Sequence, residues 1–186
     1  MARLQIAKLD AAKRQLETAI RLYFHEADPV SIHTLTAAGY ELIKDLNKHW
    51  GGDPMWTKEM LPNQWAKPEY RAELLQSLNE AENFFKHADK DHDQLLDFNP
   101  RQTELLLLDA CEKYHVMTGE RSPLFLVYRM WAYLTWAKGM VRDESLLGTI
   151  ERIKSSQPNQ TRPAFFGEWI EIAQDPLIMS RYKESL

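Results

Sequence analysis

The sequence of 186 residues is poor in the residues that favour β structure and tight turns. It contains 4 valines and 7 glycines, against 24 leucines and 17 alanines. Valine favours pleated strands, whereas leucine and alanine lose little conformational freedom on entering a helix. No Asn-Gly or Asp-Gly dipeptide of the kind that closes β-hairpins occurs. These absences exclude an all-β sandwich or barrel and predict an all-α protein.

The chain also lacks disulfide partners and long apolar runs. Cys111 is the only cysteine, and a chain of 21.8 kDa can bury a core without disulfides or structural metals. The most apolar stretch, 124–140, contains Arg129 and Lys138 and is shorter than the roughly 20 clean residues that a membrane helix needs. The first 20 residues alternate charged and apolar side chains, unlike a signal peptide. We therefore expect a cytoplasmic protein that does not contact membranes.

An excess of basic residues is absent as well, since the net charge is −4. Residues 80–97 hold six acidic and two basic side chains, so this segment accounts for the whole net charge. Proteins that grip nucleic acid through its phosphates carry a basic surface. Tight nonspecific binding of nucleic acid is therefore not expected, although a local RNA site stays open.

A capping residue followed by proline occurs at Asp28-Pro29 and at Asn99-Pro100, and each pair predicts the start of a helix. Gly119 is a typical helix stop. The short link at Asp28-Pro29 predicts an antiparallel helical hairpin. Together with apolar residues spaced three and four apart, these signals predict helices over residues 3–26, 29–47, 68–88, 100–118, 123–140, 143–156 and 163–184, the last broken at Pro176.

The segment 50–67 is rich in glycine, proline and tryptophan, which predicts an irregular connection packed across the bundle. The helix after it has the clearest apolar stripe, formed by Leu74, Leu78, Ala81, Phe85 and Ala88. We predict a single domain over residues 1–186. Residues 1–140 form an antiparallel bundle core, residues 141–186 form C-terminal helices packed on it, and the whole contains about six to eight helices.

The loop 89–100 holds carboxylates at nearly alternate positions, where they can converge on a hard cation. The carboxylates are those of Asp89, Asp91, Asp93 and Asp97. The loop is similar to an EF-hand calcium loop, but Gln94 occupies the glycine position and Pro100 the position of the closing glutamate. We interpret the loop as a solvated turn, with weak Ca²⁺ or Mg²⁺ binding as the alternative.

The histidines offer no specific metal pattern. Glu112 and His115 form a single Glu-x-x-His element, whereas carboxylate-bridged bundles use two. His25 and His33 lie near the first interhelical turn without a diagnostic spacing. Glycine-rich phosphate loops and nucleophile motifs do not occur either, so we predict no cofactor.

One face of the helix predicted over residues 68–88 carries a row of polar side chains. Asn79, Asn83 and His87 are four residues apart and lie nearly opposite the apolar stripe, with Glu82 and Lys86 beside them. Such a row is either a solvated face or a second interface.

Residues 82–87, Glu-Asn-Phe-Phe-Lys-His, resemble the Arg-x(4–6)-His signature of the HEPN superfamily. These are compact helical bundles of prokaryotic toxin, defence and stress systems, and the resemblance covers roughly residues 3–140. Active members are similar to metal-independent ribonucleases in which motifs from two subunits face each other, histidine serves acid–base or positioning work, and arginine stabilises phosphate charge. Glu82 stands at the arginine position, where a carboxylate repels a scissile phosphate.

The resemblance implies Asn83 and His87 as the only catalytic candidates, and Asn79, Asn83, Lys86 and His87 as the binding or interface surface. We therefore expect a non-catalytic, cytoplasmic interaction or regulatory module that forms a homodimer and contacts a protein partner or RNA. A metal-independent ribonuclease using His87 is the first alternative. A metal-binding helical protein, using loop 89–97 or the histidines, is the second.

Overall fold

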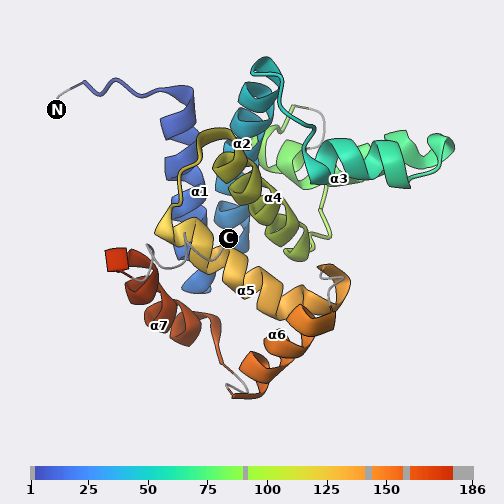
Figure 1. Ribbon diagram of the computed structural model, residues 1–186. Helices are drawn as coiled ribbons and strands as arrows, with labels where there is room; N and C mark the ends of the chain where they lie inside the picture. The colour runs from blue at the N-terminus through green and yellow to red at the C-terminus, as the bar shows by residue number, and fades with distance from the viewer. Residues whose placement is uncertain (1–2, 90–91, 141–143, 157–159, 178–186) are drawn as a thin grey trace.

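The computed structural model describes residues 3–89, 92–140, 144–156 and 160–177. Its helices are α1 (Lys8–Phe24), α2 (Pro29–His49), η1 (Trp56–Trp65), η2 (Pro68–Tyr70), α3 (Arg71–Lys86), α4 (Arg101–Thr118), α5 (Pro123–Met140), α6 (Glu144–Ser156) and α7 (Arg162–Gln174) (Figure 1). These described ranges contain no β-strand. The all-α prediction is confirmed.

Helices α1 and α2 form the expected antiparallel hairpin. The Asp28 carboxylate accepts a hydrogen bond from the Ser31 N–H at 2.7 Å, and Pro29 is the first residue of α2. The two helices approach closely at Gly39, where an added Cβ would lie 2.8 Å from Leu16 Cγ. Helix α1 begins at Lys8 instead of residue 3.

The connection after α2 is more ordered than the irregular segment that the sequence predicts. Residues Trp56–Trp65 form a wide helix of the π type, in which the Met60 N–H donates to the Met55 oxygen at 2.9 Å. Met55 enters the main core. The packing across the bundle is confirmed, because η1 contacts both α3 and α4.

Helix α3 covers most of its predicted range but not its predicted environment. It contacts η1, η2 and α2, and its N-terminal part projects from the bundle (Figure 1). Of the predicted apolar stripe, only Ala81 is buried, whereas Leu74, Leu78 and Phe85 are half-buried and Ala88 is exposed. The stripe therefore lies outside the main core, and its Phe85 packs on the His33 and Phe98 rings.

The predicted end of α4 is confirmed, but Pro100 and not Asn99 occupies its N-cap position. Asn99 Oδ1 accepts from the Arg101 N–H at 3.1 Å, and the helix begins one residue later than expected. Gly119 ends it with a left-handed φ of 67°, a conformation that suits glycine.

The C-terminal helices follow the predicted boundaries. Helix α5 is kinked at Trp136, and α7 ends at Gln174, just before Pro176. The rest of the helix predicted to residue 184 lies outside the described residues, apart from positions 175–177.

One hydrophobic core unites most of the molecule. It is formed by side chains of α1, α2, α4, α5 and α7, together with Met55. At its lower end Phe24 stacks on Phe166, with ring centroids 5.0 Å apart. Helix α7 thus contributes to the same core as residues 1–140, where the sequence suggested only a covering element.

Candidate functional site

The polar row of α3 lies at the surface. Asn83 and His87 are exposed, and Asn79 is half-buried. His87 follows the last residue of the helix, and its backbone N–H donates to the Asn83 oxygen at 3.0 Å. The Lys86 amine turns toward Glu82, at 2.5 Å. Asn83 and His87 are therefore both accessible, whereas the Lys86 amine is bound to the protein.

Glu82, the first residue of the segment 82–87, is only 8% exposed. One carboxylate oxygen accepts from Lys58 Nζ at 2.7 Å and the other from Lys86 Nζ at 2.5 Å. Desolvation raises the pKa of this carboxyl, but the hydrogen bonds and charges of the two lysines outweigh it and hold the pKa below its usual value. Glu82 is therefore an internal ion-pair partner, charged and turned away from solvent.

Lys58 joins η1 to both neighbouring helices. Its side chain is 4% exposed, and its amine also donates to Glu41 of α2 at 2.8 Å and lies 5.3 Å from the centre of the Tyr40 ring. A buried ammonium needs such partners because leaving it unpaired in the interior costs several kcal/mol. We call Glu41, Lys58, Glu82 and Lys86 the ion network; it fixes the base of α3 on the bundle.

Asp109 of α4 binds both α2 and the start of η1. Its carboxylate accepts from the Tyr40 hydroxyl at 2.9 Å and from the backbone N–H groups of Thr57 at 2.8 Å and Trp56 at 3.2 Å. Burial, followed by the charge of Asp109, raises the pKa of Tyr40 far above its usual value. Asp109 thus provides the cap of η1 from a distant helix.

His33 lies in the interior beside the ion network. Its ring packs against Phe98 and Phe85, with centroids 5.2 and 5.7 Å away, and Nδ1 lies 2.8 Å from the Thr103 hydroxyl. The imidazole is 0% exposed, and burial lowers its pKa from 6.5 to about 4. His33 is therefore a neutral core residue and not a member of a surface metal site.

The acidic loop is exposed as far as it is described. Asp89, Asp93 and Asp97 face solvent, whereas Asp91 lies outside the described residues. His92 Nε2 lies 3.0 Å from an oxygen of Asp93. Within the described part of the chain, no three histidine, cysteine or carboxylate side chains are arranged to hold a metal ion. The Glu112 carboxylate instead binds Arg129, with Nε and Oε1 2.6 Å apart.

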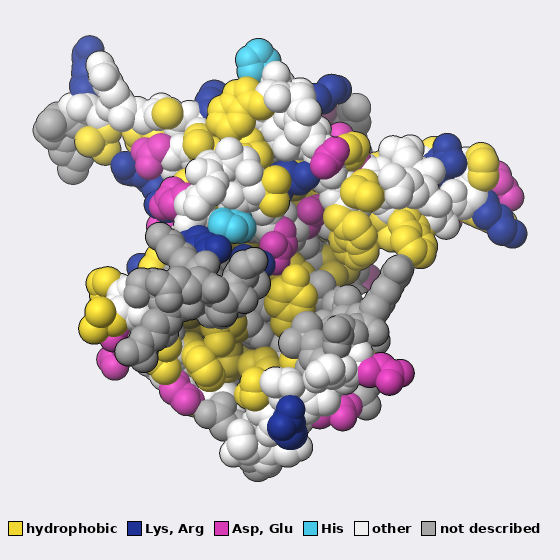
Figure 2. Space-filling model, in the orientation of Figure 1, with side chains coloured by type: hydrophobic (Ala, Val, Ile, Leu, Met, Phe, Trp, Pro, Cys, Tyr) yellow, Lys and Arg dark blue, Asp and Glu magenta, His cyan; other side chains and the backbone are white. Residues whose placement is uncertain are grey.

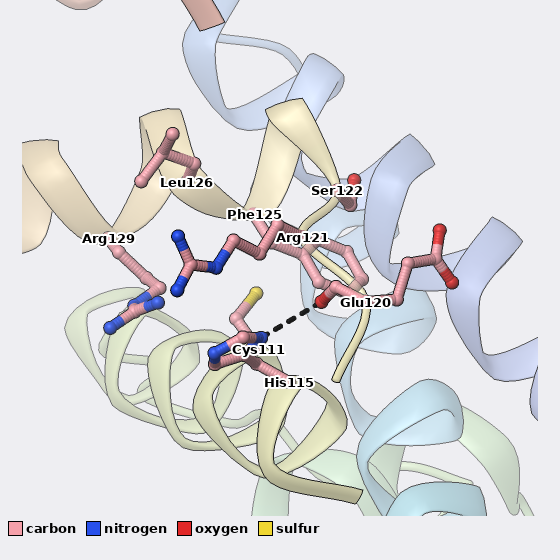
Figure 3. Close-up of a pocket in the computed structure, with 8 residues that line it drawn as sticks. All are labelled: Cys111, His115, Glu120, Arg121, Ser122, Phe125, Leu126 and Arg129. Carbon is pink, nitrogen blue, oxygen red and sulfur yellow. Dashed lines mark hydrogen bonds between the residues drawn. The ribbon is translucent and has the colours of Figure 1, made fainter. Parts of the chain in front are cut away.

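A pocket that the sequence did not indicate lies between the end of α4 and the start of α5. Figure 3 shows its lining residues, which are Cys111, His115, Glu120, Arg121, Ser122, Phe125, Leu126 and Arg129. We call it the α4–α5 pocket; its volume is about 120 Å³. Its two arginines come from the α4–α5 link and from the second turn of α5, and their spacing matches no familiar motif.

The charges that face the α4–α5 pocket are positive. The Arg121 and Arg129 guanidinium groups and the His115 ring converge on it, whereas the Glu120 side chain points away (Figure 3). That carboxylate instead binds Lys13 and accepts from the Tyr114 hydroxyl at 2.6 Å. Burial raises the pKa of the Cys111 thiol well above its usual value, so the floor of the pocket is neutral.

Exposed aromatic side chains gather near the projecting end of α3. Trp65 is 68% exposed and Tyr70 is 56% exposed. We call residues 65–86 the arm; hydrophobic side chains follow it on the face shown in Figure 2. Large exposed aromatics at one end of a helix are typical of a contact surface.

Comparison of the chain with protein-family models, curated proteins and solved structures gave no significant match. In the described part of the chain, no helix is long and apolar enough to cross a membrane.

Proposed function

We propose that the protein is a non-catalytic interaction module, HEPN-like in architecture, in which the arm of one copy docks against the arm of a second copy. The observation on which this proposal rests is the projection of the arm with exposed Trp65 and Tyr70. Tryptophan and tyrosine dominate the binding energy of many interfaces because they bury a large area at a small entropy cost.

The composition of the arm favours its own copy as the partner. Residues 65–75 contain two basic and two acidic side chains, so this surface has no net charge. A two-fold axis places identical patches against each other, and a neutral apolar patch meets itself without like-charge repulsion. The ion network holds the base of α3 in place, so that little ordering is required on association.

The ion network also supports the non-catalytic part of the proposal. Cleavage of RNA needs a positive group beside the phosphate in the transition state. Residues 82–87 contain one lysine, Lys86, whose amine is bound to Glu82. Asn83 and His87 are left without a free arginine or lysine from this motif.

The solution mass tests the proposal. We expect light scattering to give twice the 21.8 kDa chain mass for the wild type. The double substitution Trp65→Ser with Tyr70→Ser yields a monomer. The matched control Trp50→Ser removes a tryptophan that is 54% exposed but lies at the end of α2, and it leaves the dimer intact. A monomeric wild type, or a dimer that survives the double substitution, overturns the proposal.

A second measurement addresses turnover. We expect no cleavage of single-stranded RNA by the wild type in the presence of a metal chelator. Cleavage that disappears in His87→Ala, but persists in the exposed-histidine control His92→Ala, would replace the proposed module with a ribonuclease that uses His87.

A further inference from the structure

We propose that the α4–α5 pocket binds a tetrahedral oxyanion of the phosphate class. The proposal is independent of the arm, because the pocket lies at the opposite end of α4 from the Asn99 cap and contains no arm residue.

The first observation is an unpaired cation. Arg121 Nη1 is buried, yet it has no hydrogen-bond partner among the described residues. A buried donor without a partner costs about 1–3 kcal/mol, so such groups are normally satisfied by water or by a bound ion. Figure 3 shows the Arg121 guanidinium directed toward the space above Cys111 and beside Arg129. The structure thus orients a donor for a ligand that the protein does not supply.

The second observation is the set of donors around Arg121. Arg129 holds Glu112 through Nε at 2.6 Å, which fixes its guanidinium at the edge of the pocket. Planar guanidinium groups match the paired oxygens of phosphate. The neighbouring carboxylates are already bound: Glu120 to Lys13, Glu112 to Arg129, and Glu17 to the Ser122 hydroxyl.

His115 completes the arrangement. Its Nδ1 lies 3.0 Å from the Glu120 carbonyl oxygen, and a carbonyl can only accept, so Nδ1 bears the proton. The other ring nitrogen faces the two arginines in Figure 3. It can accept a hydrogen bond from a P–OH group of phosphate, or donate one to an unprotonated phosphate oxygen when the ring itself is protonated. This nitrogen is therefore suited to either ionic form of phosphate.

The size of the pocket selects the ligand. About 120 Å³ is many times the roughly 10–15 Å³ that one water needs but is too small for a nucleotide. A free phosphate ion fits entirely, and a phosphate monoester fits if its organic part remains outside. Both present the same group to Arg121.

The test is a titration of the full chain with inorganic phosphate, in which binding is measured by calorimetry and by the ³¹P line width. A titration with sodium chloride at matched ionic strength is the reference. We expect saturable binding by the wild type. Arg121→Gln weakens it about tenfold or more, as expected for loss of a charged hydrogen-bond donor, and Arg121→Lys falls between them. The matched control Arg152→Gln, on the exposed surface of α6, binds as the wild type does.

Circular dichroism and thermal unfolding verify that each variant is folded; Arg121→Gln removes no ion pair from the described structure. Phosphate binding that is equally strong in Arg121→Gln, or no saturable binding by the wild type, overturns the proposal. A parallel titration with O-phosphoserine separates the two sources of the group. Tighter binding of the monoester identifies a phosphorylated ligand, and tighter binding of the ion identifies free phosphate.

Discussion

His33 illustrates how one residue connects burial to pH. The folded chain protonates this imidazole only near pH 4, whereas the unfolded chain does so near pH 6.5. Between these values the unfolded state binds more protons, so the free energy of unfolding falls as the pH falls. Glu82 and the lysines at positions 58 and 86 also act on the ring: the carboxylate raises the pKa of His33 and the two lysines lower it, but burial has the larger effect.

We therefore expect the wild type to lose about 2 kcal/mol of unfolding free energy between pH 7 and pH 5 from this residue alone. Urea unfolding at both values measures the loss. His33→Gln is less stable at pH 7 but lacks most of this dependence. The exposed control His92→Gln keeps it, and an equal slope in wild type and His33→Gln would contradict the assignment.

Lys58 is the residue on which the ion network depends. Lys58→Met leaves Glu82 buried without its strongest partner, and breaking such a pair from one side destabilises by about 3 kcal/mol or more. The double substitution Lys58→Met with Glu82→Leu removes both charges and costs less than the single one. Lys44→Met, whose partner Glu41 is more exposed, costs less than about 1 kcal/mol. Chemical denaturation of the wild type and the three variants gives their free energies of unfolding. A double variant that is less stable than Lys58→Met would contradict the prediction.

At the scale of elements, η1 depends on α4, because Asp109 of α4 accepts hydrogen bonds from the first N–H groups of η1. Asp109→Ala removes the acceptor of the Trp56 and Thr57 N–H groups. We expect the exchange of these two amide protons with solvent to accelerate about tenfold or more, because a lost charged acceptor is worth about 1.5–3 kcal/mol. Hydrogen exchange read by NMR measures it. Asp45→Ala, exposed on α2, serves as the control and leaves both rates unchanged.

The contact between α1 and α2 depends on a glycine. Gly39→Ala places a Cβ 2.8 Å from Leu16 Cγ, and the forced shift costs about 1–3 kcal/mol, more than the helix propensity that alanine gains. Gly148 of α6 has no atom within 4 Å of the same Cβ position, so Gly148→Ala stabilises by about 0.5–1 kcal/mol. In thermal unfolding we expect the midpoint temperature to fall for Gly39→Ala and to rise for Gly148→Ala. A rise for both variants would show that α1 and α2 adjust freely.

For the whole molecule, the helices could be predicted wherever their signals are local. Asp28-Pro29 and Gly119 act on the residues next to them, and the structure confirms both boundaries. The segment 56–65 could not be predicted as helical because the carboxylate that caps it lies more than 50 residues away, at Asp109. The apolar stripe of α3 indicated an amphipathic helix correctly, but periodicity does not say which surface covers the stripe.

The candidate sites show the same limit. A glutamate is ordinarily expected at the surface, and only the position of Lys58 in space explains the burial of Glu82. Arg121 lies in a short link between helices, where an exposed arginine is the ordinary expectation. Its orientation follows from the crossing of α4 and α5, which no short motif records. For this reason the sequence led only to the end of α3, which stays a prediction, and did not indicate the α4–α5 pocket.

The burial of Cys111 gives the chain a native chemical reporter. The thiolate is the nucleophile that attacks a disulfide reagent and displaces its leaving thiolate, and this sulfur is both 0% exposed and held in its neutral form by burial. We expect a disulfide reagent to modify the native protein far more slowly than the urea-unfolded chain, with equal rates as the contrary result. Because the sequence has one thiol, the kinetics contain a single phase. The rate of that phase measures how often α4 and α5 separate, without any introduced label.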